Sequence, residues 1–297
     1  MVFIFVKGHK TSQLSIEIDN NTWMLPTERW ENNHLLSIDY RLKPDSMKLI
    51  DKINKNTNPI SSFGKVVQGL TAYDKYQGQD PKIIKERGYH HSYKKDDTCG
   101  KWLSGKDINR YCQTWSEEWL SYGPWLAAPR EKYFFEEERI LFREVPGKNK
   151  RIQATIVEGT FYYGHSITPF KKNFDEKISL KYLLGIINSK LVSYYAQLLL
   201  PNFGKNIFPK LNPNDIKLLP IYSVDLTDQN EKACYDQIIS LVEKMLDMNQ
   251  QFIKLNTPIE KNIFKRQIET TDNQIDQLVY QLYALTDEEI QIIESEV

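Results

Sequence analysis

The sequence predicts an α+β fold, in which a body of short mixed strands is followed by an antiparallel helical hairpin. Residues 61–180 consist of short, aromatic-rich segments separated by glycine and proline, without long helical periodicity. Beyond them, apolar residues recur every three or four positions, as in paired helices. We therefore expect three parts: an N-terminal connecting segment with strands and a helix, the body, and the hairpin, at residues 1–59, 60–225 and 226–297.

The connecting segment contains patterns of both kinds. "QLSIEI" alternates loosely and indicates a strand, as does much of residues 1–25. "DSMKLIDKINKN" has apolar residues near helical spacing and predicts a helix, and "TNPISSFG" ends it. In the body, "RILFREV" and "RIQATIVEG" predict two strands joined by the turn "PGKNK", and "GTFYYGHSI" predicts another.

Residues 179–200 predict one buried helix. Ser179 is a suitable N-cap, and the inner face is formed by Leu183, Leu184, Ile187, Leu191 and Tyr194. Asn188 and Ser189 are small polar residues inside it, which we interpret as close packing against a neighbouring helix. A loop with Gly204, Lys205, Asn206 and Lys210 follows. Its basic character fits either an acidic partner outside the protein or ordinary turn chemistry.

The C-terminal part shows the strongest helical pattern. A heptad seam is formed by Ile238, Leu241, Met245, Met248, Phe252 and Leu255. Thr257, Pro258 and Glu260 then form a helix start, with a capping box and a proline at the first position. A second apolar stripe continues through Ile263, Ile268, Ile275, Leu278 and Leu282. "TDEE" at residues 286–289 opens a last short helix.

Composition limits the class of protein. The three cysteines, Cys99, Cys112 and Cys234, are widely spaced, which argues against a disulfide framework and a zinc site and favours a reducing, cytoplasmic setting. No apolar run reaches the length of a membrane span, so we expect no membrane partner.

The net charge of zero hides a segregation of charge. Residues 61–220 hold 25 basic and 17 acidic side chains, whereas residues 221–297 hold 6 basic and 15 acidic ones. A basic body attracts polyanions, nucleic acid first among them, although uneven charge between the halves of a protein is also common.

The sequence contains no recognisable catalytic motif. It lacks a G-x-G-x-x-G or Walker loop, an F-x-G-x-G cofactor loop and an N-P-P-Y tetrapeptide. His90 and His91 are adjacent, so on a strand they point to opposite faces and do not chelate one metal. The glutamates of "FFEEERI" are best explained by a solvated turn. We interpret the chain as a binding module without a metal or cofactor of its own.

Several stretches together resemble the TaqI-like C-terminal specificity domain, the target-recognition part of type IIG restriction–modification enzymes and adenine-specific DNA methyltransferases. They are, in order, "ISSFGKVVQGLTAYDKY", "KWLSGKDINRY", "LAAPREKYFFEEERILFREV", "YLLGIINSKLVSYYAQ" with "FPKLNPNDIKLLPI", and "IDQLVYQLYALTDEEIQII". The resemblance runs from about residue 45 to the end, and the ordered set is more specific than any one stretch.

The resemblance implies sequence-specific recognition of duplex DNA. It also implies a catalytic domain, fused or separate, that methylates adenine N6 with S-adenosylmethionine, with or without an endonuclease. Bases are read by arginine, asparagine and glutamine, and phosphates are bound by basic residues. The candidate DNA-binding residues are Gln68, Thr71, Tyr73, Lys75, Lys106, Arg110, Arg130, Arg143, Lys148, Lys150, Arg151, Lys205, Asn206 and Lys210. The alternative is a non-catalytic protein-interaction adaptor that uses the C-terminal heptad helices.

Overall fold

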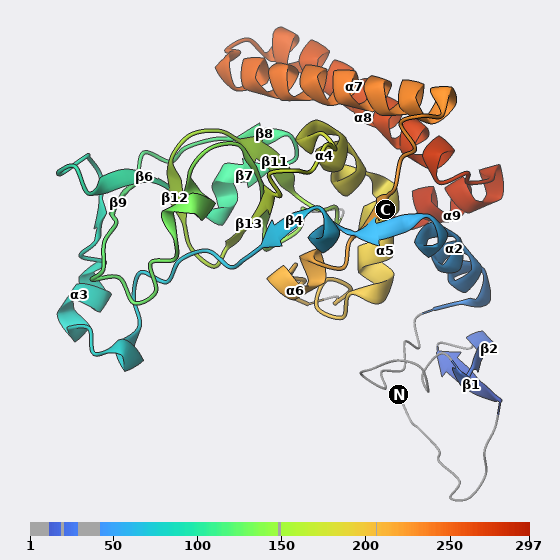
Figure 1. The fold of residues 1–297 in the computed structure, drawn as a ribbon, viewed down its shortest axis with the longest axis horizontal. Coiled ribbons are helices and arrows are strands. Elements are labelled where there is room, and N and C mark those ends of the chain that lie inside the picture. The colour runs from blue at the N-terminus through green and yellow to red at the C-terminus, as the bar shows by residue number, and fades with distance from the viewer. Residues whose placement is uncertain (1–11, 19–20, 29–41, 148–149, 206) are drawn as a thin grey trace, which may run out of the picture. The chain divides into compact units, whose positions relative to one another are not determined.

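The computed structural model of the chain is an α+β protein, as the sequence predicts (Figure 1). It describes residues 12–18, 21–28, 42–147, 150–205 and 207–297. The chain divides into two compact units, Met1–Lys55 and Asn56–Val297. Within the described ranges, no helix is both long and apolar enough to cross a membrane.

The first unit contains the predicted strand and helix of the connecting segment. Strand β1 (Gln13–Ile18) pairs with β2 (Asn21–Pro26) in an antiparallel hairpin. Helix α2 (Pro44–Lys55) follows, and it buries Leu49, Ile50 and Ile53. Their spacing is the one that predicts this helix from the sequence.

The second unit is built around two four-stranded sheets. The first has the order β11–β10–β13–β4 and is antiparallel throughout. Its strands are β4 (Gly64–Val66), β10 (Arg139–Arg143), β11 (Ala154–Val157) and β13 (Ile167–Lys172). Strands β10 and β11 are the two that the turn "PGKNK" was expected to join, and their antiparallel pairing agrees with it.

The second sheet has the order β12–β6–β9–β5, and its β12–β6 pair is parallel. Its strands are β5 (His90–His91), β6 (Cys99–Leu103), β9 (Trp119–Ser121) and β12 (Phe161–Tyr163). Leu103, Leu120 and Tyr163 from this sheet share a core with Leu141 and Ile167 from the first. The two sheets therefore form one body.

Smaller elements connect the sheets. Two-stranded ladders join β3 (Thr57–Pro59) to β14 (Pro220–Tyr222), and β7 (Ile108–Asn109) to β8 (Cys112–Gln113). The short helices are α3 (Pro81–Glu86) and α6 (Pro213–Ile216), with 3₁₀ turns η1 (Ile60–Ser62), η2 (Lys75–Gln77), η3 (Gly105–Asp107) and η4 (Lys132–Phe135).

The prediction of one helix over residues 179–200 is wrong in one respect, because the chain forms two helices. Helix α4 (Leu180–Asn188) ends and α5 (Lys190–Leu199) begins at Ser189, whose backbone is extended. The Ser189 side chain accepts a hydrogen bond from the Val192 N–H and so caps α5. Asn188 and Ser189 therefore mark a helix break, and the break leaves the Asn188 carbonyl available to other partners.

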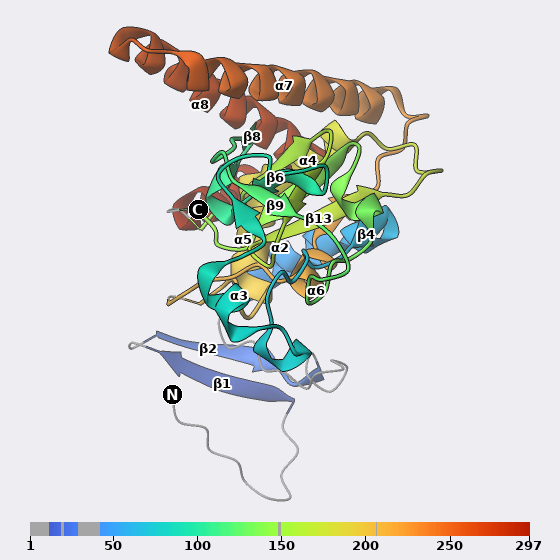
Figure 2. The same cartoon turned by 90° about the vertical axis from the view of Figure 1, so that its left-hand side faces the viewer.

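The predicted hairpin is present. Helix α7 (Gln229–Lys254) and helix α8 (Pro258–Leu282) lie side by side along the body, over α4 (Figures 1 and 2). Thr257 caps α8 as expected, and Thr286 with Glu289 forms the capping box of α9 (Asp287–Glu296). A methyl group on Gly185 of α4 would come within 2.7 Å of Ile238, so this glycine lets α7 approach closely.

Candidate nucleic-acid interface

A groove of about 830 Å³ opens beside β4, where three separate segments meet. One wall follows β4, the second is the segment before and within η4, and the third is α6. We call it the α6 groove. Its lining residues are Val66, Val67, Gln68, Pro129, Arg130, Glu131, Phe134, Asn212, Pro213, Asn214 and Lys217. Two predicted DNA-binding residues, Gln68 and Arg130, are therefore brought together although 62 positions separate them in the sequence.

Arg130 is held in an unusual backbone conformation at the edge of this groove. Its φ is +62°, in the left-handed region that a non-glycine residue rarely adopts. The Tyr122 hydroxyl donates a 2.5 Å hydrogen bond to the Arg130 carbonyl oxygen, which fixes this turn. The side chain remains exposed. Backbone strain of this kind clusters at functional sites, where the surrounding structure maintains it.

Sequence reasoning missed several polar residues of the groove, among them Asn214 and Lys217. The Lys217 ammonium donates a 3.1 Å hydrogen bond to Asn214 Oδ1, and the Ser61 hydroxyl donates to the Lys217 carbonyl oxygen. The bond from Lys217 orients the Asn214 amide through its oxygen, and the Asn214 NH₂ group takes no part in that bond. The signal in the sequence was the pattern "LNPNDIK", in which Pro213 and the Asn212–Asp215 capping box predict a helix start.

The groove contains guanidinium and amide side chains, whose different hydrogen-bonding patterns can select between different planar ligands. A guanidinium group presents a rigid fork of donors, and an amide presents a donor beside an acceptor. Arg130 supplies the first, and Gln68 and Asn214 supply the second. Glu131 adds one carboxylate, so the groove is mixed in charge and not a uniform cationic channel.

The loop after α5 leads directly into α6. Lys205 Nζ donates to Asn202 Oδ1 at 2.8 Å, and Lys210 Nζ lies 2.9 Å from Glu144 Oε1. Between these lysines, Ile207 and Phe208 are 74% and 82% exposed. The predicted basic loop is therefore present, with two exposed apolar side chains that sequence reasoning did not consider. Asn206 lies outside the described residues.

Arg110 and Arg151 depart from the predicted role, because both side chains are inside the protein. Arg110 forms a bidentate pair with Asp272 of α8, at 2.8 and 2.5 Å. Arg151 Nη1 lies 3.1 Å from the same carboxylate, and its Nη2 lies 3.5 Å from Asp276 Oδ1. Both guanidinium groups also donate to the Asn188 carbonyl oxygen, at 2.9 and 2.6 Å. We call these five residues the arginine clamp.

The clamp joins the body to the hairpin and explains the helix break. The carbonyl that Ser189 leaves free is the one that both arginines bind. Burial raises the pKa of Asp276 to about 6, and the neighbouring Asp272 charge adds to this effect. Burial acts in the same direction on Asp272, but Arg110, Arg151 and Lys190 together outweigh it and lower the pKa of that carboxyl.

The other candidates lie at separate places. Thr71 Oγ1 bonds His165 Nε2, and the Tyr73 hydroxyl bonds His90 Nδ1, so both side chains have partners within the protein. Lys75 lies over the Tyr76 ring, and Lys106 lines a second hollow of about 650 Å³ with Arg87 and Glu118. Arg143 is half-buried at the end of β10, and Lys150 has a positive φ. Lys148 lies outside the described residues.

The two histidines of β5 point to different partners, as expected for neighbours on a strand. His90 packs edge-on against Trp102, whereas His91 bonds the Ser121 hydroxyl. Burial lowers the pKa of His90 to about 3, so this ring is neutral at physiological pH.

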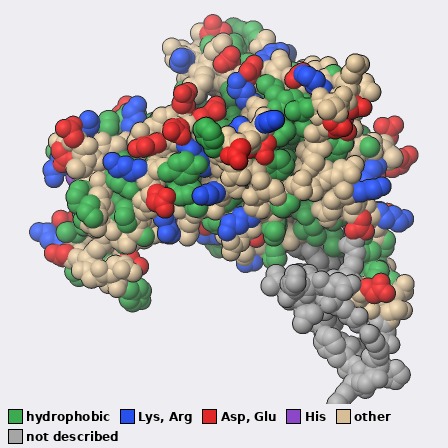
Figure 3. All heavy atoms as spheres, viewed as in Figure 1, with side chains coloured by type: hydrophobic (Ala, Val, Ile, Leu, Met, Phe, Trp, Pro, Cys, Tyr) green, Lys and Arg blue, Asp and Glu red, His purple; other side chains and the backbone are tan. Residues whose placement is uncertain are grey.

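Basic and acidic side chains alternate over the face in Figure 3, so this face has no patch of a single charge sign.

Residues 100–221 match the family model of the TaqI-like C-terminal specificity domain. The predicted resemblance is confirmed for this range, which extends from β6 to β14 and includes Arg130 and Lys217. The flanking stretches that resemble the family, at 60–76 and beyond 221, lie outside it.

No curated protein matches the chain. A solved structure described as "Structure of Type IIL restriction-modification enzyme MmeI in complex with DNA has implications for engineering of new specificities" shows 10% sequence identity and a TM-score of 0.49. The match covers 80% of this chain and 36% of that chain, so this chain spans about a third of its length.

Proposed function

We propose that this chain, which contains a TaqI-like C-terminal specificity domain at residues 100–221, recognises a specific sequence in duplex DNA as the specificity region of a type II or IIG restriction–modification DNA methyltransferase. The observation that carries the proposal is the α6 groove. There a strained, exposed arginine lies with two side-chain amides that come from distant parts of the sequence.

The groove contains suitable residues for reading base edges. Arginine forms bidentate hydrogen bonds with guanine, and asparagine or glutamine does so with adenine. In this proposal Arg130 contacts a guanine, and Gln68 and Asn214 contact adenines. A uniformly basic channel binds all DNA sequences alike. The mixed charge of the groove therefore supports recognition of base sequence over nonspecific binding of the DNA backbone.

Exposed lysines around the groove would position the duplex. Lys65 is exposed on β4, and Lys205 stands on the loop that leads into α6. Phosphate contacts fix orientation without carrying sequence information. Ile207 and Phe208 on the same loop are the kind of side chain that wedges between base steps.

The catalytic step belongs to another domain in this proposal. A methyltransferase domain, fused or separate, would extrude the adenine and transfer a methyl group to N6 from S-adenosylmethionine. The present chain would bind the target sequence for this methyltransferase domain, in the cytoplasm. The support is the family match together with the sequence itself, which contains neither a cofactor loop nor an N-P-P-Y tetrapeptide.

A salt titration of DNA binding tests the proposal. Binding of a labelled duplex to the full chain should weaken as salt rises, with a log–log slope of about −0.9 per phosphate contacted. Lys232→Ala is a suitable control, because Lys232 pairs with Asp236 on the acidic helix α7. Binding that does not depend on salt, or no binding at low salt by the folded chain, would refute DNA recognition.

A methyl-transfer assay tests the division of labour. The purified chain alone should not transfer labelled methyl groups from S-adenosylmethionine to DNA. Transfer by this chain alone would overturn the proposal that catalysis lies elsewhere.

The adaptor alternative also has an observation in its favour. The outer surface of the α7–α8 hairpin contains a hollow of about 950 Å³. If DNA binding fails in the salt titration, this surface becomes the principal candidate for function.

A further inference from the structure

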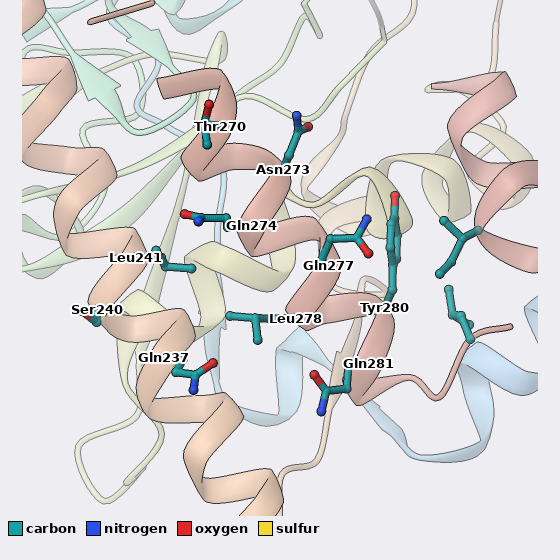
Figure 4. Close-up of a pocket in the computed structure, with 12 residues that line it drawn as sticks. Gln237, Ser240, Leu241, Thr270, Asn273, Gln274, Gln277, Leu278, Tyr280 and Gln281 are labelled. Atoms are coloured by element: carbon teal, nitrogen blue, oxygen red, sulfur yellow. The ribbon is translucent and has the colours of Figure 1, made fainter. Parts of the chain in front are cut away.

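The hairpin has two faces with different surroundings. On the inner face, Ile238 and Val242 of α7 pack against Gly185 of α4, and Ile275 of α8 is fully buried. The opposite face carries the hollow of about 950 Å³, between α7, α8 and α9 (Figure 4). We call it the outer groove. Its lining residues are Gln237, Ser240, Leu241, Thr270, Asn273, Gln274, Gln277, Leu278, Tyr280, Gln281, Leu285 and Ile290.

The outer groove has no charged lining residue although it lies in the most acidic part of the chain. Residues 221–297 hold 6 basic and 15 acidic side chains, yet all twelve lining residues are uncharged. Apolar side chains and amides together are typical of the centre of a protein interface, from which charges are depleted. An ordinary solvated helix face would instead be charged.

The side of α8 that lines the outer groove continues as a stripe to the tip of the hairpin, where it includes one exposed cation, Arg266, four residues before Thr270. Ile259 and Ile263 lie eleven and seven residues before Thr270, which places them on the same side of the helix as the groove. They are 75% and 51% exposed. From Ile259 to Gln281 the stripe is about 33 Å long at 1.5 Å per residue. This is a long surface to leave in water, and its length suits another helix pair.

Charge along the hairpin is strongly polarised. The tip, residues 251–268, contains four basic side chains and one acidic side chain. The flanking residues 221–250 and 269–297, which we call the base, contain two basic and 14 acidic side chains. A hairpin with a basic tip and an acidic base is complementary to its own copy when the two run in opposite directions.

We propose that the occupant of the outer groove is the hairpin tip of a second copy of this chain. The two hairpins pack antiparallel about a two-fold axis and form a four-helix bundle. Ile259 and Ile263 of each tip then cover the outer groove of the other copy, and each basic tip faces an acidic base. A two-fold arrangement uses the same surface on both copies and closes on itself.

The arrangement leaves both recognition bodies free. Each body packs on the inner face of its hairpin, through Gly185 and the arginine clamp, whereas the dimer uses the outer face. The two bodies therefore lie on opposite sides of the bundle. Parallel packing would instead place tip against tip and base against base, where like charges repel.

Sedimentation velocity of the full chain over a concentration series tests this proposal. The chain should shift from monomer to dimer as concentration rises, and added salt should favour the monomer. Ile263→Asp places a carboxylate on the exposed stripe and should weaken the dimer more than about tenfold, because an unpaired charge would be buried. Circular dichroism should show unchanged helicity.

Ile253→Asp is the matched control. Ile253 is 47% exposed, close to Ile263, but lies three turns from Val242 and so on the inner side of α7. Ile253→Asp changes the tip charge as much as Ile263→Asp does but buries no carboxylate in the interface, so it should weaken the dimer far less. The double variant Lys261→Glu/Lys265→Glu should weaken dimerisation through the tip charge alone. The proposal is overturned by a folded chain that stays monomeric at every concentration, or by a dimer that Ile253→Asp disrupts as strongly as Ile263→Asp.

Discussion

Arg130 in the α6 groove and Arg110 in the arginine clamp have opposite environments. The Arg130 side chain is exposed, and its backbone is held in a strained turn by Tyr122. Arg110 is 19% exposed and bound through both terminal nitrogens to Asp272, 162 positions away. An arginine of the body therefore has a structural role when the acidic C-terminal part of the chain supplies its partner. Such a role becomes visible only in the fold.

The energetic consequences of the two environments differ in kind. A buried guanidinium is tolerated only while its carboxylate partner is present, because an uncompensated buried charge is costly. An exposed arginine needs no partner for folding, so its side chain is available for a ligand. Changes in the clamp should therefore act on stability, and changes in the groove should act on DNA.

The largest expected effect is on the clamp. Asp272→Asn leaves Arg110 and Arg151 with one carboxylate, Asp276, and should lower the free energy of unfolding by about 3–5 kcal/mol. Urea denaturation measures it. Glu269→Gln is the control on the same helix, because its pair with Lys265 is long, at 3.9 Å, and exposed. Its effect should be below about 0.5 kcal/mol. Equal effects of the two variants would contradict the clamp.

The next effect is a pH dependence. The pKa of Asp276 rises from 3.8 to about 6 on folding, so the folded state retains a proton that the unfolded state loses between these values. This carboxyl therefore lowers stability as pH rises from about 4 to 6, and its effect is constant above that. Asp276→Asn should gain stability relative to the wild type over this window, by at most about 3 kcal/mol at 1.4 kcal/mol per pKa unit. A difference that stays flat with pH, measured by urea denaturation, would contradict it.

Two matched Arg→Lys variants should separate the roles of Arg130 and Arg110. Arg130→Lys should preserve stability and the salt dependence of DNA binding but should reduce discrimination between sequences, by about 1–3 kcal/mol. Arg110→Lys keeps its charge but loses the bidentate geometry with Asp272, so it should lower stability and leave the DNA affinity of the folded fraction unchanged. Stability and duplex binding are measured for both. The reverse pattern would exchange the roles assigned to the two arginines.

The smallest effect is expected at the loop after α5. Lys205→Ala should weaken binding to all duplexes alike and reduce the salt slope by about one unit, if Lys205 contacts a phosphate. Arg143→Ala is the companion variant at the end of β10. If Arg143 reaches a guanine, it should affect the cognate site more than random DNA. A sequence-dependent loss from Lys205→Ala would argue against a phosphate contact.

The sequence predicts some parts of this molecule well for physical reasons. The α7–α8 hairpin is encoded locally, by apolar spacing and by the cap at Thr257, and the capping box at Thr286 likewise predicts the start of α9. Both form as predicted. The break at Ser189 is not apparent locally, because a good helical stripe continues through it. It depends on Arg110 and Arg151, which occupy the freed carbonyl of Asn188.

The candidate interface is predictable only in part, because it too depends on contacts between residues that are distant in the sequence. Gln68 and Arg130 belong to residue types that read bases, but their meeting in one groove depends on tertiary structure. Asn214 and Lys217 belong to the stretch "FPKLNPNDIKLLPI", which entered the sequence analysis only through the family resemblance, and their place in the groove depends on tertiary structure. Arg151 stays among the DNA-binding candidates on sequence alone, because its partners in α8 lie more than a hundred positions away.

Selection of bound duplexes from a randomised pool tests whether the α6 groove reads DNA sequence. The wild-type chain should enrich one motif. Arg130→Ala should enrich the same motif with one guanine position made degenerate, and Lys232→Ala should enrich it unchanged. Enrichment of no motif by the folded wild-type chain would contradict sequence reading by the groove. Enrichment of the unchanged wild-type motif by all three variants, Arg130→Ala, Gln68→Ala and Asn214→Ala, would contradict it as well.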